Sequence, residues 1–296
     1  MNITPRRFSR LTRILTLVFS AFGFSPISGF ENTLADPRQD FAFLEVEPYP
    51  GFEGRDSGNQ SQGPYRRYSG QLSFPAGKAW GHDLFGSIKS TVMDRRIAYG
   101  GQDLSHGPLQ RYWLSGGAIL LDKPGQSSCF IAGLGLNSDM ADLGSKDWNS
   151  EWIYIHSFET SAEFKWGLGL DIQVYFGKFV PYPLVFVDWR FAERAKLKWD
   201  ADFIELQGFI TQTLALTAGT RFNLEFFALK DDGGYEYNSL GLETGIQYFL
   251  GKNFYARLKY KELVWGEEIL DLPDGSTRKD AVRSGRSLRL NFAYGM

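Results

Sequence analysis

The chain has 296 residues, a formal net charge of −2 at pH 7 and a single cysteine, Cys129. The near-neutral charge gives no electrostatic basis for binding nucleic acid, and one cysteine excludes both an intrachain disulfide and a C-x-x-C metal or redox site. Aromatic residues make up 16% of the chain, and there are 33 glycines. Barrels with aromatic girdles and close turns have this composition, but a soluble β-sandwich can share it.

The N-terminus has the pattern of a secretory signal peptide. Four arginines between residues 6 and 13 precede an apolar run at residues 14–24, which is too short to cross a bilayer as a helix. Cleavage after Ala35 or after Gly29 fits the small residues there, and we place it after Ala35, so that residues 1–35 form the signal peptide. Beyond this run, no apolar stretch approaches the ~20 residues of a transmembrane helix.

The next segment, residues 36–64, is predicted to be a partly disordered lead-in. Its residues 41–47 (FAFLEVE) alternate weakly and are either a first strand or a pairing lead-in. Residues 48–64 are dense in Gly, Pro, Ser and Asn, which favours a loop or disorder. No linker divides the remaining residues 65–296, so we expect them to form one domain.

Alternation with period two recurs along this domain, and it is typical of β-strands because successive side chains leave a strand on opposite faces. The clearest case is residues 214–226 (LALTAGTRFNLEF), where the even positions are mainly apolar and the odd positions include Arg221 and Glu225. Comparable segments are residues 68–74, 83–94, 112–122, 129–137, 151–166, 168–176, 184–191, 195–201, 239–250, 254–261 and 288–294, and residues 202–213 are a less regular candidate.

Strands of this kind predict a transmembrane β-barrel. A tilted strand crosses a bilayer in ~9–11 residues, and one apolar face with one charged face suits lipid outside and a polar interior. Short turns alternate with longer loops in much of the chain, as in bacterial outer-membrane barrels. We therefore expect an all-β, antiparallel, up-and-down barrel of about 12 strands, within a range of 10–14.

The chain resembles bacterial outer-membrane β-barrels and, more narrowly, a barrel family known only as a domain of unknown function. This resemblance rests on residues 179–227: Tyr182-Pro183, the strands 184–191 and 195–201, and the run TLALTAGTRFNLEFFAL. The last residues, SLRLNFAYGM, look like the strand that the barrel-assembly machinery recognises, except that Met296 stands where Phe or Trp is usual. The resemblance implies an outer-membrane location, contact with outer-membrane lipid and the assembly machinery as a partner.

The charged inner positions of the strands are the candidate functional residues. They are interpreted either as a lumen that selects small solutes by charge or as a structural network of ion pairs. Arg257, Lys259 and Lys261 alternate on one strand and Arg289 lies on the next, so an open lumen would favour anions on this wall, and carboxylates of the loop 267–286 are a candidate source of compensation. The complete set of lumen-facing candidates is Arg221, Glu225, Glu243, Arg257, Lys259, Lys261 and Arg289.

The sequence indicates no enzyme, cofactor or metal site. His156 and Ser157 are neighbours in one strand and point to opposite faces, while His82 and His106 lie at strand or loop ends. The acidic loop with Asp139 and Asp147 lacks EF-hand spacing. The predicted function is an outer-membrane barrel of unknown role, with a small-solute channel as one interpretation. The alternatives are a structural or adhesion barrel that acts through its outer loops, and a soluble periplasmic β-protein.

Overall fold

The computed structural model describes residues 40–49, 65–94, 97–99, 102–105, 107–140, 143–176, 178–200, 202–229, 233–250, 254–282 and 285–295, all within one unit, Thr33–Met296. The predicted signal peptide at residues 1–35 lies outside the described residues. None of the described residues forms a helix with the length and apolar character needed to span a membrane.

Antiparallel strands account for most of these residues, together with one short 3-10 turn, η1 (Ser145–Asp147). The strands are β1 (Asp40–Tyr49), β2 (Tyr65–Ala79), β3 (His82–Met93), β4 (Ala98–Tyr99), β5 (Gln102–Asp103), β6 (Leu109–Lys123), β7 (Gln126–Ser138), β8 (Trp148–Ser161), β9 (Phe164–Tyr175), β10 (Lys178–Ala192), β11 (Ala195–Asp200), β12 (Phe203–Phe209), β13 (Leu214–Ala228), β14 (Gly234–Phe249), β15 (Phe254–Asp271), β16 (Thr277–Val282) and β17 (Arg286–Gly295).

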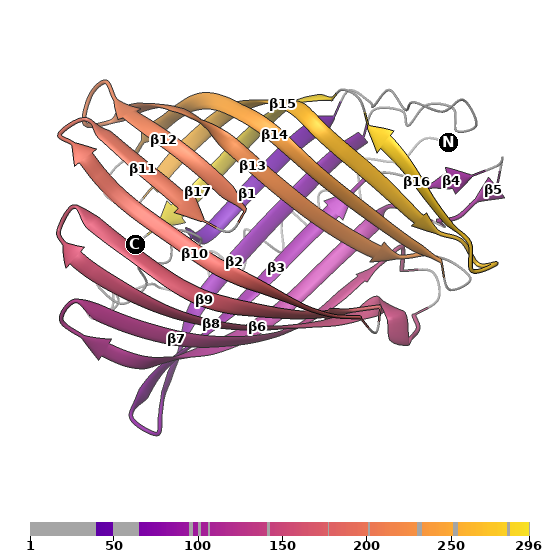
Figure 1. Cartoon of the computed structure of the whole chain (residues 1–296), viewed down its shortest axis with the longest axis horizontal. Coiled ribbons are helices and arrows are strands. Elements are labelled where there is room, and N and C mark those ends of the chain that lie inside the picture. Colours follow the sequence, from indigo (N-terminus) through magenta and orange to yellow (C-terminus); the bar gives the residue numbers. More distant parts are fainter. Residues whose placement is uncertain are drawn as a thin grey trace. The chain divides into compact units, whose positions relative to one another are not determined.

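Within the described residues, fourteen strands close into a ring in chain order (Figure 1). β1 pairs with β2 on one side and with β17 on the other, and β14 pairs with β15, so the sheet has no open end. β16 adds to β15 outside the ring, and β4 and β5 form a separate pair. The all-β, antiparallel, up-and-down barrel is confirmed, and the fourteen strands differ from the expected number of about 12 but lie at the upper limit of the expected range of 10–14.

The two additional strands come from the segments with the weakest alternation. Residues 41–47 lie in β1, which takes part in the ring, so the barrel includes part of the segment that the sequence placed in a lead-in at residues 36–64. Residues 202–213 contain β12, a complete though short strand. Pairing with neighbouring strands supplies the hydrogen bonds that the local pattern did not indicate.

Three other boundaries differ from the sequence prediction. Residues 151–166 were predicted as one strand, but a turn at Ala162-Glu163 separates β8 from β9. Pro181-Tyr182-Pro183, which we interpreted as a turn or strand entry, lies inside β10. The charged loop at residues 267–286 is largely a hairpin, because β15 continues to Asp271 and β16 returns along it.

The barrel is apolar outside and polar inside. On β17 the side chains of Leu288, Leu290 and Phe292 are 49%, 40% and 49% exposed, whereas those of Arg289 and Asn291 are 3% and 7% exposed. A protein dissolved in water has the opposite arrangement, and an outer surface with this many exposed apolar side chains calls for an apolar surrounding. The facing therefore argues against the soluble alternative.

An apolar belt surrounds the barrel. Leu216, Ile246, Leu258 and Leu290 lie opposite one another on β13, β14, β15 and β17, and all four are exposed. Towards the long loops an outward ion pair, Arg286 Nη2 to Glu262 Oε1 at 3.5 Å, interrupts the belt, and Val264 beyond it is again exposed. On β15 the uninterrupted part covers residues 254–261, close to the ~9–11 residues of a tilted bilayer crossing.

We call the end with the two-residue turns, such as Trp80-Gly81, the turn end and the opposite end the loop end. At the loop end, β13 stays paired with β14, but its last residue, Ala228, also pairs with Ser138 of β7, which lies six strands away along the sheet. The prediction that all even positions of residues 214–226 face outward is therefore wrong for the last two. Leu224 is half-buried, and Phe226 is buried against Tyr175.

A cluster of buried apolar side chains forms around this contact. We call it the loop-end cluster, and it joins parts of the chain that lie near the ends of β3, β6, β13, β14, β15 and β16. Its packing places apolar bulk at the loop end of the barrel. The cluster consists of Met93, Ile97, Leu104, Leu109, Phe227, Leu229, Tyr235, Tyr237, Leu263, Leu270 and Val282.

Candidate functional site

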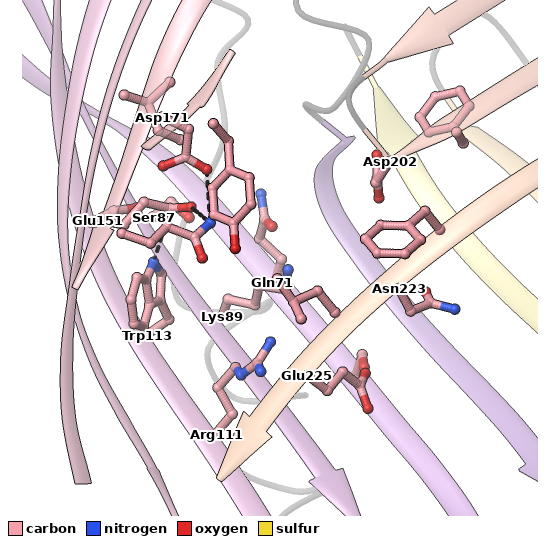
Figure 2. A pocket seen from close by; sticks show the side chains of 18 of the residues that line it. Gln71, Ser87, Lys89, Arg111, Trp113, Glu151, Asp171, Asp202, Asn223 and Glu225 are labelled. Atoms are coloured by element: carbon pink, nitrogen blue, oxygen red, sulfur yellow. Dashed lines mark hydrogen bonds between the residues drawn. The ribbon is translucent and has the colours of Figure 1, made fainter. Parts of the chain in front are cut away.

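An interior cavity of about 610 Å³ lies inside the strand ring (Figure 2). It is lined mainly by inward side chains, because alternate positions of every strand face the interior. Five of the seven sequence-predicted residues line it: Arg221, Glu225, Arg257, Lys259 and Arg289. The other two, Glu243 and Lys261, are also buried, with 5% and 2% of their surface exposed.

Glu243 of β14 is the centre of an ion network on one half of the wall. Its carboxylate lies 3.0 Å from Arg289 Nη1, 3.4 Å from Arg221 Nε and 3.3 Å from Lys259 Nζ. These three cations come from β17, β13 and β15. One buried carboxylate therefore joins four strands, and its loss would leave three cations short of a partner.

Further carboxylates complete this network from neighbouring strands. Arg289 also contacts Glu47 at 3.3 Å and Glu45 at 3.5 Å, both on β1, and Lys259 is hydrogen-bonded to Glu205 of β12. The pairing puts Lys259 directly opposite Arg289, as expected for one shared wall. We define the interior ion network as Glu45, Glu47, Glu205, Arg221, Glu243, Lys259 and Arg289.

The compensation differs from the source we expected. Carboxylates of the loop at residues 267–286 were the candidate, yet Glu268 accepts a hydrogen bond from Tyr235 and Asp271 accepts one from Thr277. The strand residues Glu45, Glu47 and Glu205 neutralise the wall instead. The contacts thus match the structural interpretation for this half of the barrel: an ion-pair network rather than a free cationic strip.

Sequence reasoning missed Arg67, which links β2 to β13. Arg67 Nη1 lies 3.0 Å from Glu225 Oε1 and 3.9 Å from Glu47 Oε2. Arg67 stands at the start of a segment that alternates clearly, so its inward facing follows from the pattern. Its partner does not, because β2 and β13 are far apart in the sequence and meet only across the interior.

The opposite wall carries a different polar group. Glu151 accepts hydrogen bonds from Trp113 Nε1 and Gln173 Nε2, each at 3.2 Å, and Gln173 also donates to Asp171 at 2.7 Å (Figure 2). These residues lie on β6, β8 and β9. The indole of Trp113 is thereby held flat against the wall, where it lines the cavity.

A glycine makes room for this indole. A Cβ atom at Gly135 would lie only 1.5 Å from Trp113 Cε3. We predict that Gly135→Ala displaces the ring into the cavity and lowers the free energy of unfolding by about 1–3 kcal/mol, the usual cost of overpacking. Urea unfolding followed by tryptophan fluorescence measures it. In the control Gly116→Ala, the new methyl meets its nearest atom at 3.7 Å, and equal costs at both positions would contradict the prediction.

Four cations that line the cavity make no ion pair among the described residues. They are Lys89 of β3, Arg111 of β6, Lys198 of β11 and Arg257 of β15, and Arg257 donates a hydrogen bond to Gln247 at 2.8 Å. The guanidinium carbon of Arg111 lies 5.5 Å from the ring centre of Phe226, and its Nε and Nη2 are buried without a hydrogen-bond partner in the described part of the chain. Lys89 and Arg111 lie on the adjacent strands β3 and β6, and we call their side of the cavity the cationic half.

His82, His156 and Asp147 of the acidic loop make local contacts. His156 packs edge-on against Phe158, while the neighbouring Ser157 is buried beside Ser127, so the two side chains lie on opposite faces. His82 Nδ1 lies 3.0 Å from the carbonyl oxygen of Ile119, and His106 lies outside the described residues. Asp147 accepts a hydrogen bond from the Gly144 amide.

Comparisons with known proteins give distant likenesses only. No protein-family model matches the chain, and no curated protein matches it. Among solved structures, the NanC porin has a TM-score of 0.37 at 9% identity, covering 86% of this chain and 100% of its own. The Pseudomonas putida toluene transporter TodX has a TM-score of 0.42 at 9% identity, covering 87% of this chain and 90% of its own.

A third solved structure belongs to a different kind of protein. The β domain of the Bordetella autotransporter BrkA has a TM-score of 0.27 at 12% identity, covering 87% of this chain and 100% of its own. All three scores are below 0.5, so these likenesses carry no argument about this chain. The fold stands on its own strand pairing, and the function has to be argued from the cavity.

Proposed function

We propose that the protein is an outer-membrane β-barrel whose interior cavity takes up a small anionic solute. The apolar belt and the outward orientation of the apolar side chains support the membrane location. The closed barrel supports it too, because it leaves no unpaired strand edge in lipid. The solute class follows from the charges in the cavity. A barrel of this size is wide enough to enclose more than its own side chains.

The observation that carries the proposal is the contrast between the two halves of the cavity. In the interior ion network, each cation contacts at least one carboxylate. On the opposite side, Lys89 and Arg111 face the same cavity without an ion pair among the described residues. Cations that line a polar cavity without a partner attract anions, and a small anion would supply the missing hydrogen-bond acceptors.

The proposal is tested by current measurements across planar bilayers. Protein purified from outer membranes should conduct with a preference for chloride over potassium in a salt gradient. The double variant Lys89→Gln with Arg111→Gln should weaken that preference, because it removes the two cations of the cationic half. We expect small currents, since the loop-end cluster places apolar side chains at one end of the barrel.

The matched control is Lys78→Gln. Lys78 pairs with Asp83 at 3.0 Å near the turn end and its side chain is 74% exposed, so its loss should leave the reversal potential unchanged. An unchanged reversal potential in the double variant would contradict the assignment of the cationic half. Recovery of all the protein in a soluble fraction, or the absence of any current, would contradict the proposed function itself.

A further inference from the structure

The barrel wall is incomplete on one side. β11 and β12 contain six and seven residues, whereas their neighbours β10 and β13 contain fifteen each (Figure 1). Pairing between β10 and β11 reaches no further than Val187, and pairing between β12 and β13 stops at Arg221. Residues 178–186 of β10 and 223–228 of β13 thus have no strand between them, and we call this gap the side notch.

The edge of β10 at the side notch lacks two of the backbone donors that a neighbouring strand would need. Pro181 and Pro183 lie two residues apart in this stretch, so their backbone groups face the same edge. Proline has no N–H and is tolerated in a sheet only where no ladder bond is needed. Their presence removes two donors from an edge that would otherwise expose them to an apolar surrounding.

The interior cavity reaches into the side notch. Its lining includes Pro183 of β10 and Phe222 of β13, both exposed on the outer face, and Asp202 and Phe203 at the end of the short hairpin. A continuous wall would separate outward side chains from an interior cavity. Their shared lining shows that the cavity passes through the wall here, with Phe226 stacked on Tyr175 at 3.8 Å as the far rim.

An unpaired charge lies close to this apolar opening. Arg111 reaches from β6 across the interior to the ring of Phe226, 5.5 Å away, and Lys89 stands on the adjacent strand β3. The neighbouring Arg67 is held by Glu225 at 3.0 Å. The cavity therefore combines two cations inside the barrel with Pro183, Phe222 and Leu224 at the exit.

We propose that the side notch admits a single-chain amphiphile with an anionic head group. The head binds Lys89 and Arg111, while the chain lies against Pro183, Phe222 and Leu224 and extends into the surrounding lipid. This inference rests on the proposed function and names the solute class of the same cavity. A route through the wall spares the chain the passage through the apolar side chains at the loop end.

The test measures protection of a cysteine in the notch. The protein with Cys129→Ala and Leu224→Cys, in phosphatidylcholine vesicles, is reacted with N-ethylmaleimide with and without dodecanoate. We expect dodecanoate to slow the reaction several-fold, and to lose this effect when Lys89→Gln and Arg111→Gln are added. Acetate has no chain and dodecyltrimethylammonium has the wrong charge, so neither should protect. If Leu224→Cys does not fold, Phe222→Cys replaces it.

The control cysteine is Leu288→Cys, which lies on the outer face of β17, separated from β13 by β14 and β15, and should show no protection. Vesicles that contain lysophosphatidylglycerol, which has one acyl chain, separate the sources when dodecanoate is left out: protection there identifies a membrane lipid as the anion. Equal protection by dodecyltrimethylammonium, protection that survives the loss of both cations, or no protection at all would overturn the inference. If the chloride preference persists in that case, the proposed function stands and only the side route is wrong.

Discussion

Replacing Glu243 by glutamine should lower the free energy of unfolding by about 3–5 kcal/mol, the cost of removing one partner from buried ion pairs. The substitution keeps the shape of the side chain and removes its charge. Arg221, Lys259 and Arg289 then lose a shared carboxylate, and each of them is largely buried. Urea unfolding of the protein refolded into lipid vesicles measures the change.

The matched control is Glu262→Gln on the outer face. Glu262 also pairs with an arginine, Arg286, but the two side chains are 53% and 69% exposed. An exposed pair contributes about 0–1 kcal/mol, so this variant should unfold almost like the parent protein. A similar cost for both variants would show that Glu243 is no more important than a surface charge, and that the network does not hold the barrel together.

Introducing arginine at Ile246 should destabilise the protein by about 2–4 kcal/mol, the cost of a charge on the lipid face of a barrel near the midplane. Ile246 is 45% exposed and lies in the row of Leu216, Leu258 and Leu290, within the apolar belt. The same unfolding measurement in lipid applies. The result depends on lipid, so the cost should shrink when the protein is studied in a detergent that lets water reach the side chain.

Position along the strand provides the control. Leu250 directly follows β14 at the turn end and is 60% exposed, so Leu250→Arg can place its charge at the membrane surface. There the cost of an arginine falls to about 0–1 kcal/mol. Equal costs at Ile246 and Leu250 would mean that the belt does not span a bilayer. A larger cost at Leu250 would mean that Leu250, and not Ile246, lies nearer the midplane.

The fold was largely predictable because facing in a strand depends on local alternation. Residues 214–226 lie in β13 and residues 288–294 in β17. In these segments the exposed apolar side chains are those of Leu216, Phe222, Leu288, Leu290 and Phe292, whereas Leu224 is half-buried and Phe226 is buried. The number of strands was harder to predict from the sequence. The turn at Ala162-Glu163 contains neither glycine nor proline, and the aromatic residues on both sides continue the pattern across it. A period of two therefore marks strands more reliably than it marks their ends.

The sequence predicted which charged side chains point into the barrel, but not which of them form ion pairs with one another. The alternation of Lys259 and Lys261 with apolar neighbours indicates that both lie inside, where the structure has them. Whether Lys259 meets Glu205 or a loop carboxylate depends on which strands are neighbours and in what register. The side notch exists because β11 and β12 are short. Pro181 and Pro183 are its visible signal, although the sequence alone indicates a turn or a strand entry there.

Closure between β1 and β17 has a consequence for how the barrel folds. Arg289 donates a hydrogen bond to Glu47 across 242 positions of sequence, so the seam joins two distant stretches of the chain. The entropic cost of closing so long a loop is met before any bond of the seam forms, and contacts of this separation make folding slow. Until then β1 and β17 each present a row of unsatisfied backbone groups, which invites pairing with other chains. A nascent barrel therefore needs its edges shielded until the seam forms.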